Sequence, residues 1–279
     1  MDAHTSIIEL GIYIKGLRDE LGLTLEQLAN SSEVSERNIT RIEKGKVEAR
    51  EATLMSILKV LDKTHEEVQK EIGYLRTKFD NGISRVMDLA FKGRFGEAKA
   101  TANNLSHEYQ AYLGCTYYKQ RFLLAKGTLM QREETYSQRL SLYVEGLQLT
   151  QPTMLLFVEG EFKQLDIAQV KDSILDEVEY YLIKQMATTL GLLNKVEEAA
   201  MIFISLLEAF QNEYISTHIK NTLTPIICAS LGYYFLEIKG SVAQASSYIE
   251  QGIMHSHQTG NHRSLPYLQS LRQSMEKKF

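Results

Sequence analysis

Apolar residues recur with a helical period along almost the whole chain, and neither a strand-like alternation nor a hairpin turn persists. In residues 7–21 they follow the period of an amphipathic helix, and Gly22 then stands where a glycine ends many helices. Thr24 and Gln27 have the spacing of a capping box, which opens a second helix. The chain has only 3 prolines, which favours long helices because proline interrupts them. The pattern therefore predicts an all-α protein.

Three further helices are expected before residue 71. Ser35 is placed to cap a third helix that Gly45 stops, and the apolar positions of residues 50–62 predict a fourth. Thr64 and Glu67 repeat the capping-box spacing, so a fifth helix begins there. Five short helices, with the second and third joined by a tight turn, indicate a helix-turn-helix domain.

The remainder of the chain shows three junctions that look alike, at residues 91–105, 192–207 and 237–253. Each junction ends one helix at a Gly or Asn and opens the next with small residues, among which Ala98, Ala199 and Ala245 occupy like places. The pattern resembles degenerate tetratricopeptide (TPR) repeats, so we expect a right-handed TPR-like α-solenoid. The helices are expected at 73–92, 95–111, 114–130, 133–149, 153–163, 173–191, 195–212, 216–237, 242–258 and 264–277.

Two domains follow from this division, a helix-turn-helix domain in residues 1–70 and a repeat domain in residues 71–279. The formal net charge is −4, which excludes a uniformly basic coat for nucleic acid but allows a local basic surface. Residues 35–50 contain five basic and three acidic residues, so positive charge gathers around the expected third helix.

The stretch "LRDELGLTLEQLANSSEVSERNITRIEKG" resembles the helix-turn-helix of phage-repressor-like (XRE) regulators. The resemblance implies that Arg18 and Glu43 form a structural bridge between the first helix and the recognition helix. It also implies that DNA is contacted at eight positions, which are Thr24, Ser35, Glu36, Arg37, Asn38, Thr40, Arg41 and Lys44.

The resemblance also implies which of these positions contact bases and which contact phosphates. Glu36, Arg37 and Arg41 match positions that reach base edges, and an arginine there can bond guanine with both of its nitrogens. Asn38 and Thr40 match positions that contact either a base or the backbone. The phosphate-contacting positions of the motif fall on Thr24, Ser35 and Lys44.

Two positions depart from the usual pattern of the motif. Leu25 replaces a polar residue at the start of the second helix, which removes one candidate contact to the DNA backbone. Glu36 replaces a basic or amide residue. Its carboxylate either accepts a hydrogen bond from cytosine N4 or holds Arg37 or another basic neighbour in place.

A phage-repressor-like domain followed directly by TPR-like repeats is the layout of the RRNPP family of peptide-responsive regulators, in its Rgg/PlcR-like branches. The resemblance implies a cytoplasmic homodimer that binds a double-stranded DNA operator, expected to be an inverted repeat. It implies that the repeats bind a short signalling peptide in quorum sensing and thereby alter the dimer geometry. Amides and cations are the candidate peptide contacts, and a solvated surface role is the alternative for each of Arg121, Lys184, Gln185, Asn212 and Asn221.

Two other functions compete with this interpretation. In the first, the repeats only dimerise or bind a protein partner, and there is no peptide ligand. In the second, the repeats sequester another regulator, which an intact recognition helix argues against.

Motifs of catalysis are not found in the sequence, which has no Walker loop, GxSxG, HExxH or CxxC, so we expect neither an enzyme nor a cofactor. The spacing of His255, His257 and His262 does not place three imidazoles on one helix face, so no metal site is expected. Cys115 and Cys228 are expected to be buried free thiols. No signal peptide is evident, and the 15-residue uncharged run at 222–236 is too short to span a membrane.

Overall fold

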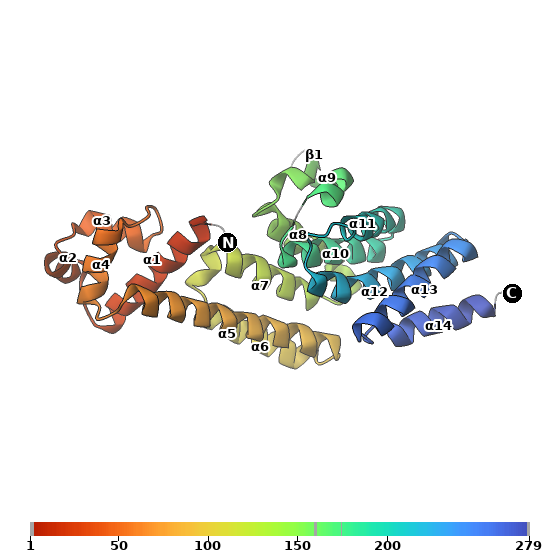
Figure 1. Cartoon of the computed structure of the whole chain (residues 1–279), viewed down its shortest axis with the longest axis horizontal. Coiled ribbons are helices and arrows are strands. Elements are labelled where there is room, and N and C mark those ends of the chain that lie inside the picture. Colours follow the sequence, from red (N-terminus) through yellow and green to blue (C-terminus); the bar gives the residue numbers. More distant parts are fainter. Residues whose placement is uncertain (1–2, 159–160, 174, 278–279) are drawn as a thin grey trace. The chain divides into compact units, whose positions relative to one another are not determined.

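The computed structural model describes residues 3–158, 161–173 and 175–277, and helices dominate it (Figure 1). The all-α class predicted from the sequence is confirmed. The chain divides into two compact units, Met1–Ala125 and Lys126–Phe279, called here the N-terminal and C-terminal units. The helices of the N-terminal unit are α1 (Ala3–Glu20), α2 (Leu25–Ser32), α3 (Glu36–Glu43), α4 (Glu51–Val60), α5 (His65–Phe91), α6 (Phe95–Glu108) and most of α7 (Thr116–Thr128).

The C-terminal unit contains helices and one hairpin. In chain order its elements are α8 (Tyr136–Gln148), β1 (Leu155–Val158), β2 (Glu161–Leu165), α9 (Ile167–Asp172), α10 (Glu177–Leu192), α11 (Val196–Ala209), α12 (Thr217–Tyr233), α13 (Val242–Thr259) and α14 (Leu265–Glu276). No helix in the described ranges is both long and apolar enough to cross a membrane.

The first four helices share one apolar core. Helix α1 packs against α3, and α2 packs against α3 and α4. The fully buried side chains of Ile14, Leu28 and Ile39 come from α1, α2 and α3. At Gly11 the two helices α1 and α3 approach so closely that an added Cβ would lie 2.9 Å from the carbonyl oxygen of Glu43. A glycine is therefore required for this contact between helices.

Helix α5 joins two elements that the sequence pattern separates. The fifth helix of the helix-turn-helix and the helix expected at 73–92 form one continuous helix, His65–Phe91. Its start is the predicted capping box, in which the Thr64 hydroxyl accepts from the Glu67 amide at 3.2 Å and the Thr64 amide donates to the Glu67 carboxylate at 2.7 Å. The hydrogen bonds that the Thr64 amide and hydroxyl donate to the Glu67 carboxylate lower the pKa of Glu67. Gly73 alone does not end a helix whose neighbours all favour it, so two predicted helices are one.

A buried ion pair joins α1 to α5. The Glu9 side chain is fully buried, and its carboxylate accepts a hydrogen bond at 2.7 Å from Nε of Arg76. The Glu9 carboxylate also raises the pKa of the Arg76 guanidinium. Because breaking a buried pair leaves an uncompensated charge, this contact holds the first helix of the domain against α5.

The three repeated junctions have the backbone that their sequences predict. The residues that end the preceding helices have positive φ angles, 74° at Gly93, 66° at Asn194 and 66° at Gly240. The small residues at equivalent places after the turns are buried: Ala98, Ala199 and Ala245. Each junction connects two helices that pack together, α5 with α6, α10 with α11, and α12 with α13. The helix-pair pattern read from the sequence is thus present in both units.

The prediction of a helix at residues 153–163 is wrong. Strands β1 and β2 form an antiparallel hairpin there, in which Leu155 pairs with Leu165 and Phe157 with Phe162. The rings of Phe157 and Phe162 lie 6.2 Å apart. The aliphatic and aromatic residues of this run favour a strand, and the buried Leu155 and Leu165 give the hairpin one apolar face. The expected break at residues 164–172 contains the short helix α9, which the Asp166 side chain caps.

Both cysteines are buried and free, as expected. Desolvation raises the pKa of the Cys115 and Cys228 thiols to about 12. Neither thiol is therefore ionised near neutral pH, and each acts as an apolar core side chain.

Candidate nucleic-acid interface

Helix α3 has one buried face and one exposed, basic face. Ile39 and Ile42 are buried against the core of the first four helices. Arg37, Arg41 and Lys44 are exposed and stand at i, i+4 and i+7, which places them in one stripe along the helix and its end. The core contacts therefore fix which side of α3 presents its cations to the outside.

The predicted DNA-contacting residues are exposed or half-buried. Asn38 and Thr40 are half-buried, and the exposed members are Thr24, Ser35, Glu36, Arg37, Arg41 and Lys44. Thr24 begins α2, where its hydroxyl accepts from the Gln27 amide at 3.1 Å and its amide donates to the Gln27 side chain at 2.8 Å. The hydroxyl of Thr24 is thus fixed at the N-terminus of α2, where a phosphate would meet helix N–H groups.

Ser35 occupies the N-cap position of α3, but its side chain makes no capping hydrogen bond in the described structure. The expectation that the Ser35 hydroxyl caps the helix is therefore wrong. Its carbonyl oxygen instead accepts from the amides of Asn38 at 2.9 Å and Ile39 at 3.1 Å. This turn starts the helix through the backbone alone, and it leaves the hydroxyl available to an outside partner such as a phosphate.

The charged residues at the start of α3 have no ion-pair partner in the described ranges. No salt bridge joins Glu36 to Arg37 or to another basic residue there. Glu36 does not hold a neighbouring arginine in the DNA-free chain, so its contact with cytosine stays a prediction. As the first helical residue, Glu36 also interacts favourably with the helix dipole.

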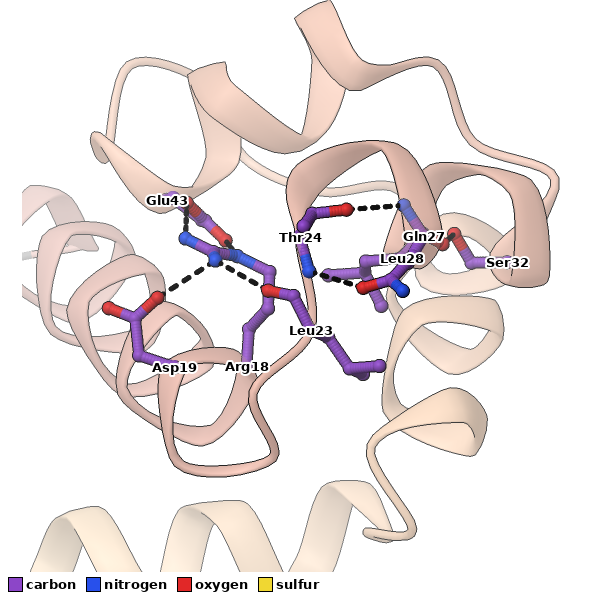
Figure 2. A network of polar contacts seen from close by, with 8 residues as sticks. All are labelled: Arg18, Asp19, Leu23, Thr24, Gln27, Leu28, Ser32 and Glu43. Carbon is purple, nitrogen blue, oxygen red and sulfur yellow. Dashed lines mark hydrogen bonds and ion pairs between the residues drawn. The ribbon is translucent and has the colours of Figure 1, made fainter.

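Figure 2 shows the contact that orients α3. Nε of Arg18 lies 2.7 Å from Oε1 of Glu43, and Nη2 of Arg18 lies 3.2 Å from Oε2 of the same carboxylate. Nη1 of Arg18 also donates to the carbonyl of Leu23 at 2.9 Å and lies 2.8 Å from Asp19. Hydrogen bonding to Glu43 raises the pKa of Arg18. The bidentate pair joins α1 to α3, and it is the geometry that the family resemblance implied for these residues.

Two further cations lie beside the eight predicted residues. Lys46 and Arg50 are exposed on the loop between α3 and α4. Both lie in residues 35–50, where basic residues outnumber acidic ones. This excess of positive charge could have been used to predict Lys46 and Arg50 as further DNA contacts. They continue the series of exposed cations that begins along the sequence with Arg37.

The predicted peptide contacts are divided between the two compact units. Arg121 lies in the N-terminal unit, where its guanidinium is 3.2 Å from the Asp80 carboxylate and 3.7 Å from the ring centre of Tyr117. Lys184 and Gln185 are neighbours on α10 in the C-terminal unit. Arg121 is therefore held by contacts within its own unit.

The two asparagines among the predicted peptide contacts have different surroundings, because Asn212 follows α11 in a turn and Asn221 lies within α12. The side-chain oxygen of Asn212 accepts from the Tyr214 amide at 3.0 Å, and its carbonyl accepts from the Lys220 ammonium at 2.7 Å. The carbonyl of Asn221 accepts from the Asn261 side chain at 2.9 Å. Lys184 and Gln185 are consecutive residues of α10.

Residues 14–68 match the helix-turn-helix family. These residues contain the buried bridge and the exposed basic stripe of α3, so the chain carries a DNA-binding helix-turn-helix domain of the phage-repressor type. No curated protein sequence matches the chain.

Solved structures extend the likeness to the whole chain. It resembles PlcR of Bacillus thuringiensis, solved in complex with the peptide PapR7 and DNA, with a TM-score of 0.52 and 14% identity over 97% of this chain and 88% of that one. ComR of S. thermophilus, solved with DNA and its signalling peptide ComS, matches at a TM-score of 0.42 and 13% identity over 96% and 99% of the two chains. The pheromone receptor Rgg2 of Streptococcus dysgalactiae matches at 0.34 and 12% identity over 95% and 99%. The PlcR match alone shows the fold, and the chain has the fold of PlcR.

Proposed function

We propose that the chain is a cytoplasmic transcriptional regulator that binds an operator through residues 1–70 and a short signalling peptide through residues 71–279. The observation that carries the DNA-binding part is the row of Arg37, Arg41 and Lys44 on an exposed helix face. The Arg18–Glu43 pair and the apolar core hold this helix in a fixed orientation. A rigid helix with a basic outer face is what reading the DNA major groove requires.

Roles within the interface follow from chemistry and position. Arg37 and Arg41, one turn apart, reach base edges, and each guanidinium can donate two hydrogen bonds to guanine. The remaining cations Lys44, Lys46 and Arg50 contact phosphates, which sets the orientation of the domain without reading sequence. The three acids of residues 35–50 limit the non-specific attraction to DNA.

Peptide binding is supported by the fold. PlcR, whose fold this chain shares over 97% of its length, is solved with both a peptide and DNA. Solenoids of paired helices bind extended segments on their concave surfaces. We propose a homodimer that places two recognition helices about one DNA turn, roughly 34 Å, apart on an inverted repeat. The peptide shifts this arrangement only if its affinity differs between the two dimer geometries.

Calorimetry with short peptides encoded next to the gene tests the peptide-binding part. We expect one apolar peptide of a few residues to bind with a negative heat-capacity change, because apolar surface is buried. Binding by none of the peptides would favour the alternative, in which the repeats only dimerise or bind a protein partner.

A further inference from the structure

The C-terminal unit contains a buried guanidinium that has only neutral partners. The Arg139 side chain on α8 is 4% exposed. Its Nη2 donates to Oε1 of Gln185 on α10 at 3.3 Å, and its Nε donates to the Tyr143 hydroxyl at 3.2 Å. Its Cζ lies 5.7 Å from the ring centre of Tyr143. In the described part of the chain no carboxylate pairs with Arg139, although buried charges are ordinarily paired.

A second cation stands beside it. Lys184, next to Gln185 on α10, is half-buried, and its ammonium has no hydrogen-bond acceptor among the described residues. Desolvation, followed by the positive charges of Arg139 and Arg263, lowers the pKa of Lys184 to about 8. Arg263 lies in the connection between α13 and α14. Cations from α8 and from the α13–α14 connection thus act on the Lys184 ammonium of α10.

Packing brings the Arg139 guanidinium to α10, and among the described residues no acid pairs with Arg139 or Lys184. Helix α8 packs against α10, which brings Arg139 to Gln185. Gln185 is 9% exposed and uses its oxygen for Arg139, so its amide nitrogen, which has no acceptor in the described structure, is free to donate elsewhere. The side chains therefore offer an incoming group several donors and two positive charges, and no acidic partner.

A carboxylate has the chemistry that this group of side chains lacks. A guanidinium can bind its two oxygens in parallel, and an ammonium adds a point charge from one side. A bound negative charge would also offset the repulsion between Arg139 and Lys184. Binding would therefore raise the free energy of unfolding of the protein.

We propose that Arg139, Lys184 and Gln185 form a carboxylate-binding site, and that the carboxylate belongs to the peptide. The proposal rests on the peptide-binding function stated above and specifies what the peptide must carry. The carboxylate comes either from the C-terminus of the peptide or from an aspartate or glutamate side chain.

Three pools of synthetic hexapeptides distinguish these sources. The first has a free C-terminus and no acidic residue, the second is C-terminally amidated with no acidic residue, and the third is amidated but contains one aspartate. Affinity selection with the full chain should retain the first or the third pool at least about tenfold more strongly than the second. Lys184→Met should abolish this preference, whereas Lys239→Met, which changes an exposed lysine paired with Glu197, should keep it.

A second measurement does not depend on peptide binding. The pKa of Lys184 is followed by NMR of 13C-labelled lysine in the chain, with and without inorganic phosphate as a probe anion. Because a bound anion favours the charged ammonium, the pKa of Lys184 should rise when phosphate is added.

The outcomes separate this proposal from the peptide-binding function. Preference for the first pool assigns the terminal carboxylate, and preference for the third assigns a side-chain carboxylate. Equal retention of all pools by the wild type and Lys184→Met overturns the carboxylate site and leaves peptide binding intact. If no pool is retained, peptide binding fails. The NMR titration then decides between a site for a small free anion, supported by a raised pKa, and no anion site, indicated by an unchanged pKa.

Discussion

At the scale of single residues, the two acids of α3 have opposite surroundings. Glu43 is 8% exposed and bonded to Arg18, so its charge belongs to the scaffold and does not face DNA. Glu36 is exposed and has no ion-pair partner in the described ranges. The sequence assigns Glu43 through the spacing of a known motif, but it cannot assign Glu36, because the partner of an exposed side chain lies outside the chain.

Replacing Arg37 or Arg41 with alanine should weaken binding to a selected DNA duplex by about 1–3 kcal/mol each, because a base-contacting guanidinium is lost. Thermal unfolding should not change, since both side chains are exposed. Fluorescence anisotropy with a duplex selected from a random pool measures the affinity. Arg85→Ala, which removes an exposed arginine from α5, is the matched control. Unchanged affinity in both variants would remove these residues from the interface.

Lys184 should make the stability of the chain depend on pH. Its pKa is about 8 in the folded chain and about 10.4 when unfolded, so the unfolded state binds more protons between these values. The free energy of unfolding should therefore rise with pH through this window, and the destabilisation is fully present below about pH 8.

Urea unfolding at about pH 7 and about pH 9.5 checks this prediction. Relative to Lys184→Met, the wild type should be less stable at the lower pH and should approach the variant at the higher pH. The difference in the free energy of unfolding between the two proteins removes the contributions of the other titrating groups, because both proteins share them. A difference that stays constant with pH would show that Lys184 titrates as an ordinary lysine.

At the scale of elements, local chemistry predicted the ends of helices better than their continuity. The capping boxes at Thr24 and Thr64 and the positive φ angles at Gly93 and Gly240 need only a few neighbouring residues, and the structure contains all four. Helix α5 and the hairpin were missed for a different reason. The fifth helix and the helix at 73–92 were expected separately although no helix-stop signal lies between them, and the short apolar run at 155–165 fits both a helix and a strand, so tertiary packing decides.

The contact between α1 and α3 depends on Gly11. Gly11→Ala should lower the free energy of unfolding by about 1–3 kcal/mol, because the new methyl group would collide with the backbone of α3. Gly16→Ala, in the same helix, has no atom within 4 Å of the added Cβ and should be neutral or stabilising by up to about 1 kcal/mol. Chemical denaturation of both variants compares the two sites. Equal effects would mean that α1 and α3 do not pack as closely as described.

At the scale of the whole molecule, α5 joins the helix-turn-helix domain to the first of the repeated helix pairs. The helix-turn-helix match ends at residue 68, within α5, and the same helix packs against α6 at the first of the three similar junctions. The buried Glu9–Arg76 pair joins α1 to this helix as well. A change in how α5 packs on α6 would therefore reach α1 and the recognition helix through contacts within the N-terminal unit.

The sequence was informative about the whole molecule where a motif has fixed spacing. The helix-turn-helix and the helix pairs could be predicted from the residues alone. The cationic group on α8 and α10 could not, because Arg139 and Lys184 are far apart in the chain and only packing brings them together. Lys184 and Gln185, two of the five predicted peptide contacts, form the proposed carboxylate site together with Arg139.

The most direct test of a peptide-responsive regulator is the dissociation constant of the selected duplex with and without the peptide that binds by calorimetry. We expect the peptide to change this constant about fivefold or more, the range of ordinary coupling between two sites. We also expect the selected duplexes to contain an inverted repeat. The same dissociation constant in the presence and absence of a bound peptide would contradict the account, because the repeats would then not control DNA binding.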